Sequence, residues 1–303
     1  MTLVLASAAD ARYGKWLINL VGSVQQRSDI FDRIVVYDLG LTPFQRRLLE
    51  GARGVDVHDV PAFVPHWREA FTWKPWIWAT VDADAVVWLD AGVTVLRPLT
   101  SFVEGIDDRS YFVVSQGVKN RECIPSDYYA LYDIPSSVGD TDVIAGGIIA
   151  FDKTGDFYAK VVLPTFDDVL SGRNLGHSPG EASPLKDDRG RRIIRDCPLF
   201  RHDQTLVNIH FYRSFRNPVV GNLDQFGGFR SPYDHREQVI WSHRRRGDYR
   251  FLPRVVYRPT TAVVGLPWGI YVYLSGRLRH YRWIARPSIL IGLARRWGMR
   301  LMR

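Results

Sequence analysis

Short apolar runs alternate with amphipathic segments through the first hundred residues of this 303-residue chain. The apolar runs predict strands, which we place at residues 3–6, 33–37, 55–60 and 86–89. The segments between them predict helices, which we place at residues 13–24, 43–51 and 67–81. Strands that alternate with helices indicate βαβ units, so the pattern predicts an α/β fold around a mostly parallel sheet.

The fourth strand ends on a single carboxylate, Asp90, which is the first candidate for chemistry. Every residue from Val86 to Leu89 is apolar, as expected of a strand that is buried on both faces of a parallel sheet. Ligands of open α/β sheets bind outside the carboxyl ends of the strands, and Ala91 and Gly92 leave room for a ligand near the backbone. The alternative is that Asp90 caps a turn, because Asp and Gly are also common in turns.

The block from Phe71 to Leu99 resembles the donor-site segment of GT-A glycosyltransferases. It contains a Trp-Lys-Pro helix with Lys74, a short linker, an apolar strand and then Asp90 with a small residue behind it. The resemblance is closest to glycogenin-like galactosyl- and glucosyltransferases and to related bacterial proteins with a Trp-Lys-Pro helix. It covers residues 1–250 and implies a GT-A fold, that of nucleotide-diphospho-sugar transferases, with helices that flank a mostly parallel central sheet.

The resemblance implies an enzyme that transfers a sugar from a nucleoside-diphosphate sugar, UDP-linked by preference, to the hydroxyl of a glycan, lipid-linked glycan or protein acceptor. In this family an Asp-x-Asp at the strand end holds a divalent metal, Mn²⁺ or Mg²⁺, on the diphosphate. Asp90 takes the place of the first aspartate, whereas Gly92 stands in place of the second. A divalent metal would therefore need other ligands in this chain.

The resemblance also implies which residues surround the nucleotide. Ser7 and Tyr13 match the segment that holds the base and ribose, with Tyr13 against uracil, and Lys74 matches a lysine that contacts the nucleotide. Asp38 ends the second strand on a carboxylate, as the fourth strand ends, so it is another candidate for this pocket. The alternatives are that Tyr13 packs in the core, Lys74 is a solvated helix residue and Asp38 caps a turn.

Residues 141–152 resemble a family segment that reads Asn-Ala-Gly before an apolar strand. The resemblance implies that Gly146 and Gly147 let the sugar approach the backbone, and Asp142 is a candidate ligand for a sugar hydroxyl. The alternative for this segment is a β-bulge.

Asp203 and Gln204 open a predicted helix and match the Asp-Gln helix start of the family. A helix N-terminus with a carboxylate and an amide can bind sugar hydroxyls close to the anomeric carbon. Together with Asp90, these two residues are the candidate catalytic residues. The alternative for Asp203 is an ordinary N-cap.

His243 follows a short predicted strand at residues 239–241. Family members carry a histidine on a late strand that completes the metal shell, so the predicted metal ligands are Asp90 and His243. The arginines at 244–246 suit the charge of a leaving diphosphate, and the alternative for His243 is a phosphate contact or a bystander.

The polar segment at residues 171–192 is long for a compact domain, which favours a loop that covers the donor or receives the acceptor.

Charge divides the chain into an acidic body and a basic tail. The net charge is +8, of which residues 240–303 carry +13 and the preceding residues −5. We expect residues 251–303 to form an Arg-rich amphipathic, helical C-terminal extension that binds an anionic membrane surface. Packing on the body, disorder and binding to nucleic acid are the alternatives. Residues 259–276 carry no charge, but Pro and Gly interrupt them, so we predict no transmembrane helix there.

Cysteine content and the start of the chain bear on the compartment. Cys123 and Cys197 form no CxxC pair, and no secretory signal precedes the first strand, which favours the cytoplasm or a peripheral position on the inner face of the membrane.

Two other function classes stay open. One is a non-catalytic GT-A-like module that binds carbohydrate or anchors an assembly at a membrane, suggested by Gly92. The other is a DNA-modifying glycosyltransferase, suggested by the basic tail.

Overall fold

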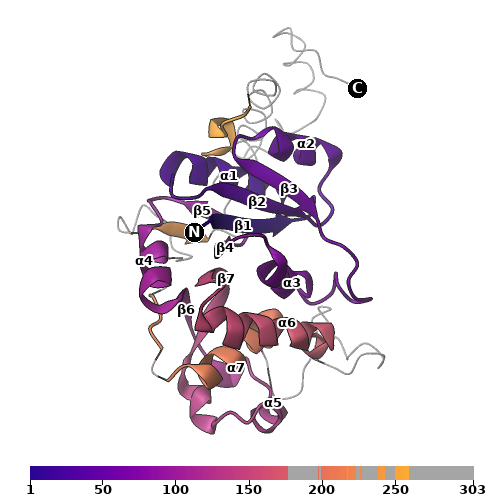
Figure 1. The fold of residues 1–303 in the computed structure, drawn as a ribbon. Helices are drawn as coiled ribbons and strands as arrows, with labels where there is room; N and C mark the ends of the chain where they lie inside the picture. Colours follow the sequence, from indigo (N-terminus) through magenta and orange to yellow (C-terminus); the bar gives the residue numbers. More distant parts are fainter. Residues whose placement is uncertain are drawn as a thin grey trace, which may run out of the picture.

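The computed structural model of the chain describes residues 1–176, 197, 199–216, 218–222, 226, 238–242 and 250–258. Six strands form one sheet with the spatial order β3-β2-β1-β4-β7-β6 (Figure 1). Their bounds are β1 Leu3–Ala9, β2 Arg33–Asp38, β3 Val55–Asp59, β4 Ala85–Leu89, β6 Tyr111–Lys119 and β7 Asp142–Asp152. A separate antiparallel pair consists of β5 Val93–Val95 and β8 Ile240–Ser242.

The four N-terminal strands of the large sheet run parallel to one another. β7 runs antiparallel to both β4 and β6, which places it beside the end of β4. The predicted α/β fold with a mostly parallel central sheet is thus confirmed. Because parallel strands end at the same edge of a sheet, the segments that follow β1, β2 and β4 meet at that edge.

Helices cover both faces of the sheet (Figure 1). One face packs against α1 Gly14–Arg27, α2 Pro43–Gly51 and α4 Thr100–Arg109. The other face packs against α3 Trp73–Thr80, the π-helical turn η3 Tyr158–Val162 and α7 Asp203–Ser214. A smaller apolar cluster joins α7 to α5 Ser126–Leu131 and α6 Leu163–Leu170. Short 3₁₀ turns are η1 Asn120–Glu122, η2 Ser136–Asp140, η4 Arg173–Leu175 and η5 Leu252–Arg254.

The strands divide their side chains between these two layers with period two. In β4, Val87 and Leu89 pack on the α1 side, whereas Val86 and Trp88 pack on the α3 side. All five residues of β4 are buried, so the continuous apolar run does mark a strand that is covered on both faces. Burial of both faces holds the end of β4, and therefore Asp90, rigidly in place.

β7 carries a bulge at its two glycines. Val113 of β6 is opposite Ile149, but Ser115, only two residues further on, is opposite Ile144. The extra residues of β7 in this interval include Gly146 and Gly147. The β-bulge expected as the alternative for this segment is therefore present, and it lies beside the end of β4.

The helix that carries Lys74 begins later than the sequence pattern predicts. The pattern predicts a helix over residues 67–81, but α3 begins at Trp73. Ala70 and Phe71 adopt left-handed backbone angles, with φ of 47° and 59°, so a helix cannot continue through them. Residues 65–72 form turns instead.

Residues 250–258 pack against the body of the protein. The amide of Phe251 donates to Asn19 Oδ1 at 3.1 Å, the amide of Val256 donates to Gln25 Oε1 at 2.8 Å, and Leu252 is fully buried. Residues 259–303 lie outside the described part of the chain, and so do the membrane-surface and nucleic-acid predictions made for them. In the part that the structure describes, no helix combines the length and apolar character that crossing a bilayer requires.

Candidate functional site

Lys74, Asp90 and Asp203 come together at the carboxyl edge of the sheet, and we call them the Lys74 group. Lys74 Nζ lies 3.0 Å from Asp90 Oδ1 and 3.7 Å from Asp203 Oδ2. It also donates to the backbone oxygen of Gly146 at 3.4 Å. Lys74 and Asp90 lie 16 residues apart, on α3 and after β4, whereas Asp203 comes from the start of α7, more than a hundred residues further along the chain.

Aromatic rings enclose the ammonium of Lys74. The ring centroids of Phe71, Trp73 and Trp88 lie 5.4, 5.8 and 5.6 Å from Nζ. Lys74 itself is only 5 % exposed, so the interpretation of a solvated helix lysine is wrong for this chain. Aromatic faces and two carboxylates together replace the water that this cation loses.

Trp88 also fixes the orientation of Asp90. Its indole Nε1 donates to Asp90 Oδ1 at 3.0 Å, to the same oxygen that accepts from Lys74. The other oxygen, Oδ2, faces Gly147, where an added Cβ would lie 2.5 Å from it. Gly147 is thus required beside Asp90 because any side chain would displace the carboxylate.

Asp203 is a buried carboxylate at the N-terminus of α7. Burial raises the pKa of Asp203 to about 6, the charge of Asp90 adds to the increase, and Lys74 acts in the opposite direction. Its Oδ2 accepts no hydrogen bond from any described residue, although it is buried. A buried acceptor without a donor is unusual, and it suits a ligand that brings its own hydroxyl group.

Gln204 acts on the backbone of β7. Its Nε2 donates to the backbone oxygen of Ile144 at 2.6 Å, and Asn208 one turn later accepts from the amide of Ile144 at 2.8 Å. An added Cβ at Gly146 would lie 3.1 Å from Gln204 Cβ. The amide of Gln204 therefore anchors the glycine bulge, which uses one of the two N–H donors of its nitrogen.

Ser7 and Tyr13 both lie at the carboxyl edge of the sheet but have different surroundings. Ser7 is fully buried and its Oγ donates to the backbone oxygen of Leu89 at 2.6 Å, which ties β1 to the end of β4. Tyr13 is 38 % exposed at the start of α1, with its ring beside Trp16. Tyr13 is therefore accessible to a ligand at this edge, and it is not a core residue.

Asp38 and Asp142 lie outside the Lys74 group. Asp38 Oδ1 accepts from the amides of Gly40 and Leu41 at 2.7 and 2.6 Å, which is the turn-capping arrangement expected as its alternative. Asp142, at the start of β7, accepts a hydrogen bond from Lys119 at 2.6 Å. This bond lowers the pKa of Asp142 below its usual value.

Asn174 is a site residue that the sequence pattern does not mark. It is fully buried, and its Nδ2 donates to the backbone oxygen of Ala70 at 3.0 Å and to Thr72 Oγ1 at 2.7 Å. Its backbone oxygen lies 2.9 Å from His202 Nδ1, which must therefore carry the proton. Asn174 thus links the turn before α3 to the residue before Asp203. Only its place in the long polar segment could have pointed to it.

The described residues do not by themselves fit a divalent-metal centre. They contain no cluster of three or more His, Cys, Asp or Glu side chains able to hold a metal. Asp90 Oδ1 already accepts from Lys74 and Trp88, and Gly92 stands where a second carboxylate would be needed. Mn²⁺ and Mg²⁺ require several oxygen ligands, and the adjacent ammonium would repel them. His243, the other predicted ligand, lies outside the described residues.

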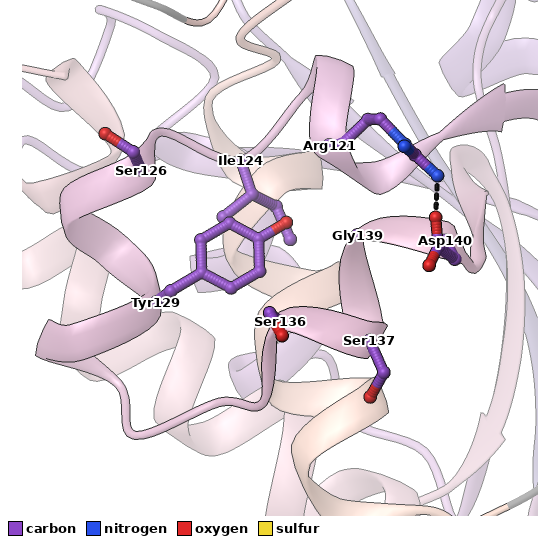
Figure 2. A pocket seen from close by; sticks show the side chains of 8 residues that line it. All are labelled: Arg121, Ile124, Ser126, Tyr129, Ser136, Ser137, Gly139 and Asp140. Carbon is purple, nitrogen blue, oxygen red and sulfur yellow. Dashed lines mark ion pairs between the residues drawn. The ribbon is translucent and has the colours of Figure 1, made fainter.

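Away from the Lys74 group, a hollow opens between η1, α5 and η2, with a volume of about 580 Å³ (Figure 2). Three serines and Tyr129 are among the residues that line it, and Arg121 forms an ion pair with Asp140 at its side. These elements connect β6 to β7. The hollow shares no lining residue with the Lys74 group, so we do not place the donor there.

The comparisons with known proteins bear on the fold. No protein-family model and no curated protein matches the chain. The bifunctional glycosyltransferase WbbM in its apo form matches with a TM-score of 0.53 and 12 % identity, over 88 % of this chain and 51 % of that one. The galactosyltransferase LgtC in complex with donor and acceptor sugar analogs matches with a TM-score of 0.48 and 14 % identity, over 90 % and 95 %.

These likenesses have a limited meaning. The chain spans about half the length of the WbbM chain, and at 12 % identity the likeness shows the fold alone. It confirms the predicted GT-A glycosyltransferase fold. The narrower prediction, membership of the glycogenin-like family, is not confirmed.

Proposed function

We propose that this chain is a glycosyltransferase that uses a nucleoside-diphosphate sugar and transfers the sugar to an acceptor hydroxyl. The nucleotide that we expect in the donor is UDP. The observation that carries the proposal is the Lys74 group. A lysine and a carboxylate from the adjacent elements α3 and β4 meet a second carboxylate from the distant helix α7, at the carboxyl edge of a sheet with the GT-A fold. Ligands of open α/β sheets bind at this edge.

Lys74 and Asp90 act on the diphosphate in this proposal. The bond between the anomeric carbon and the diphosphate oxygen breaks, and its electron pair leaves with the diphosphate. The acceptor oxygen bonds to the anomeric carbon, and the proton of the acceptor hydroxyl passes to the departing diphosphate or to water. A fixed ammonium that donates to a phosphate oxygen stabilises the charge that develops there. Asp90, held by Trp88, keeps Lys74 in place, so the ammonium needs no reorganisation when the bond breaks.

Asp203 binds the sugar that is transferred. Its buried Oδ2, which accepts no hydrogen bond within the described structure, would accept one from a sugar hydroxyl. Gln204 and the glycine bulge place the β7 backbone beside the proposed position of this sugar hydroxyl. Tyr13 would provide a flat apolar face for the base at the start of α1.

Lys74 takes the place of a metal on the diphosphate, because the described residues include no cluster of carboxylate, histidine or cysteine side chains that fits a metal. The arginines at 244–246, which follow the late strand in the sequence, would neutralise the remaining charge of the diphosphate. The acceptor is a hydroxyl of a glycan, lipid-linked glycan or protein, and the stereochemical outcome follows from its position relative to the donor.

Turnover of nucleotide sugars tests the proposal. Purified protein is incubated with UDP-glucose, UDP-galactose and UDP-N-acetylglucosamine, and release of UDP is measured with and without Mn²⁺. We expect release by the native chain and a loss of about 100-fold or more in Asp90→Asn. Asp152→Asn, a change at the far end of β7 where the carboxylate binds Thr154, is the matched control. Equal release by native chain and Asp90→Asn would contradict the role of Asp90.

A non-catalytic module is a second candidate, and Gly92 is the observation that favours it. Loss of one carboxylate of the Asp-x-Asp pair weakens metal-assisted departure of the diphosphate more than it weakens binding. Binding of a nucleotide sugar by a native chain that releases no UDP with any acceptor would favour the module over the enzyme.

A further inference from the structure

Phe71 combines an exposed ring with a strained backbone. It is 49 % exposed, and its φ of 59° lies in the left-handed region that a residue with a side chain rarely adopts. Ala70 before it has a φ of 47°, so two consecutive residues other than glycine take this conformation. Each costs free energy, and such strain persists only where the surrounding structure imposes it.

Asn174 imposes this conformation. Its buried side-chain amide binds Ala70 O and Thr72 Oγ1, on either side of Phe71. The residue gains little burial from the arrangement, because about half of its surface stays in contact with solvent. A strained backbone and the buried amide of Asn174 therefore hold an apolar ring at the surface, where exposure of an apolar ring to water is unfavourable.

The ring forms a wall of the proposed donor site. Its centroid lies 5.4 Å from Lys74 Nζ and 6.1 Å from the centroid of the imidazole ring of His202. His202 immediately precedes Asp203, whose carboxylate is directed at the same ammonium. Phe71 is therefore close to both the phosphate-binding and the sugar-binding groups of the proposal, with half of its surface available to a ligand.

We propose that Phe71 is the stacking platform for the pyranose ring of the donor sugar, an inference that rests on the proposed function. One face of a pyranose carries mainly C–H groups, which pack well on an aromatic ring, whereas its edge carries hydroxyls that need hydrogen bonds. Phe71 supplies the apolar face, and Asp203 supplies an acceptor for the edge. Phe71 and Asp203 together select a sugar that presents its apolar face to the ring and a hydroxyl of its edge to the carboxylate.

The contact between the Phe71 ring and the pyranose is measured by the ratio of the dissociation constants of UDP and of a UDP-sugar, which is the preference for the nucleotide sugar over the free nucleotide. Calorimetry of the full chain gives the dissociation constants of UDP-glucose, UDP-galactose and UDP-N-acetylglucosamine, each relative to that of UDP. We expect Phe71→Ala to reduce this preference by about 5- to 10-fold and to leave affinity for UDP within about twofold. Phe71→Tyr and Phe71→Trp should retain the preference, because both keep a ring. Leu131→Ala, which removes a 56 % exposed side chain on α5, should change neither constant.

Comparison of Phe71→Ala with Phe71→Gly separates the effect of the ring from that of the strain, because alanine keeps a Cβ at the left-handed angle and glycine does not. Phe71→Gly removes both, so we expect a higher melting temperature together with the same loss of sugar preference. Asp133→Gly, at an exposed position with a φ of 50°, should raise the melting temperature without affecting binding.

The outcomes separate this inference from the proposed function. A native chain that binds no nucleotide sugar overturns the proposed function and the platform with it. A native chain that prefers nucleotide sugars, with the same preference in Phe71→Ala, overturns the platform alone. Equal loss of affinity for UDP and for UDP-sugars in Phe71→Ala also overturns it, because the ring would then act on the nucleotide or on Lys74.

Discussion

Lys74 in α3 donates a hydrogen bond of 3.0 Å to Asp90 at the end of β4, and both residues are held by the same indole ring. This contact joins a helix on one face of the sheet to the strand end where ligands of the fold bind. The second carboxylate, Asp203, lies 3.7 Å from the same ammonium. The three charges are therefore coupled, and each can be tested through the others.

Removal of Lys74 should reveal this coupling in stability. Lys74→Met leaves a buried carboxylate without its cation, so we expect a loss of about 2–4 kcal/mol in the free energy of unfolding. Adding Asp203→Asn should cost less than the sum of the two single changes. Denaturant titration measures the cycle. In the control cycle, Lys153→Met removes an ammonium that binds the backbone oxygens of Ala79 and Val81, and additive effects with Asp203→Asn are expected. Additivity in both cycles would contradict the coupling.

Asp203 should give opposite pH dependences of stability and sugar binding. Its pKa is about 6 in the folded chain and ~3.9 in the unfolded chain, so the folded chain keeps a proton that the unfolded chain releases. Its contribution to the free energy of unfolding is thus present below pH ~4 and is lost as the pH rises through about 6. Affinity for the sugar should rise over the same range, because the carboxylate is the better acceptor.

Asp203→Asn should remove both pH dependences, which denaturant titration and calorimetry between pH 4.5 and about 7.5 would follow. Asp142→Asn is the control, because Lys119 lowers the pKa of Asp142, and its stabilising effect is lost in acid instead. An unchanged sugar-binding profile in Asp203→Asn would separate Asp203 from the sugar.

Much of this arrangement follows from patterns in the sequence. The strand that ends on Asp90 is an unbroken apolar run, and the order of the Lys74, Gly-Gly and Asp-Gln motifs predicted three segments that the fold does bring together. The strand and helix pattern gave α2 with its observed bounds. Such features depend on local periodicity or on a ligand edge that all open α/β sheets share.

The turn around Phe71 could not be predicted in the same way. Ala is the strongest helix former and Phe does not exclude a helix, but Ala70 and Phe71 have left-handed angles that delay the start of α3, in a turn bound by Asn174 about a hundred residues further along the chain. Trp88 reads as a core residue of its strand, but its indole nitrogen reaches Asp90. Tertiary hydrogen bonds of this kind leave no periodic signal, which is why the aromatic enclosure of Lys74 became visible only in the fold.

Gly147 should tolerate no side chain. In Gly147→Ala the new Cβ would lie 2.5 Å from Asp90 Oδ2, so the carboxylate must move and Lys74 with it. We expect affinity for nucleotide sugars to fall by about 10-fold or more, measured by calorimetry. Gly221→Ala adds a Cβ 3.3 Å from the ring of Phe226, away from the Lys74 group, and should leave binding unchanged. Unaltered binding in Gly147→Ala would show that the position of Asp90 is not critical.

Removal of divalent metal should leave nucleotide-sugar binding largely intact. Asp90 lacks the second carboxylate at Gly92, and the ammonium of Lys74 already occupies one of its oxygens. We therefore expect EDTA to change the dissociation constant by no more than about threefold, whereas an enzyme that binds the diphosphate through Mn²⁺ would lose most of its affinity. Restoration of strong binding by Mn²⁺ alone would place a metal ligand, with His243 as the first candidate, in the remainder of the chain.

Calorimetric titration of UDP-sugars into the native chain and into Lys74→Met tests the central claim most directly. We expect the native chain to bind UDP-sugars, Lys74→Met to bind them about 30-fold or more weakly, and Lys153→Met to bind them as the native chain does. Melting curves confirm that each variant is folded at the temperature of titration. Equal affinity in the native chain and a folded Lys74→Met, or no binding by the native chain, would contradict the account.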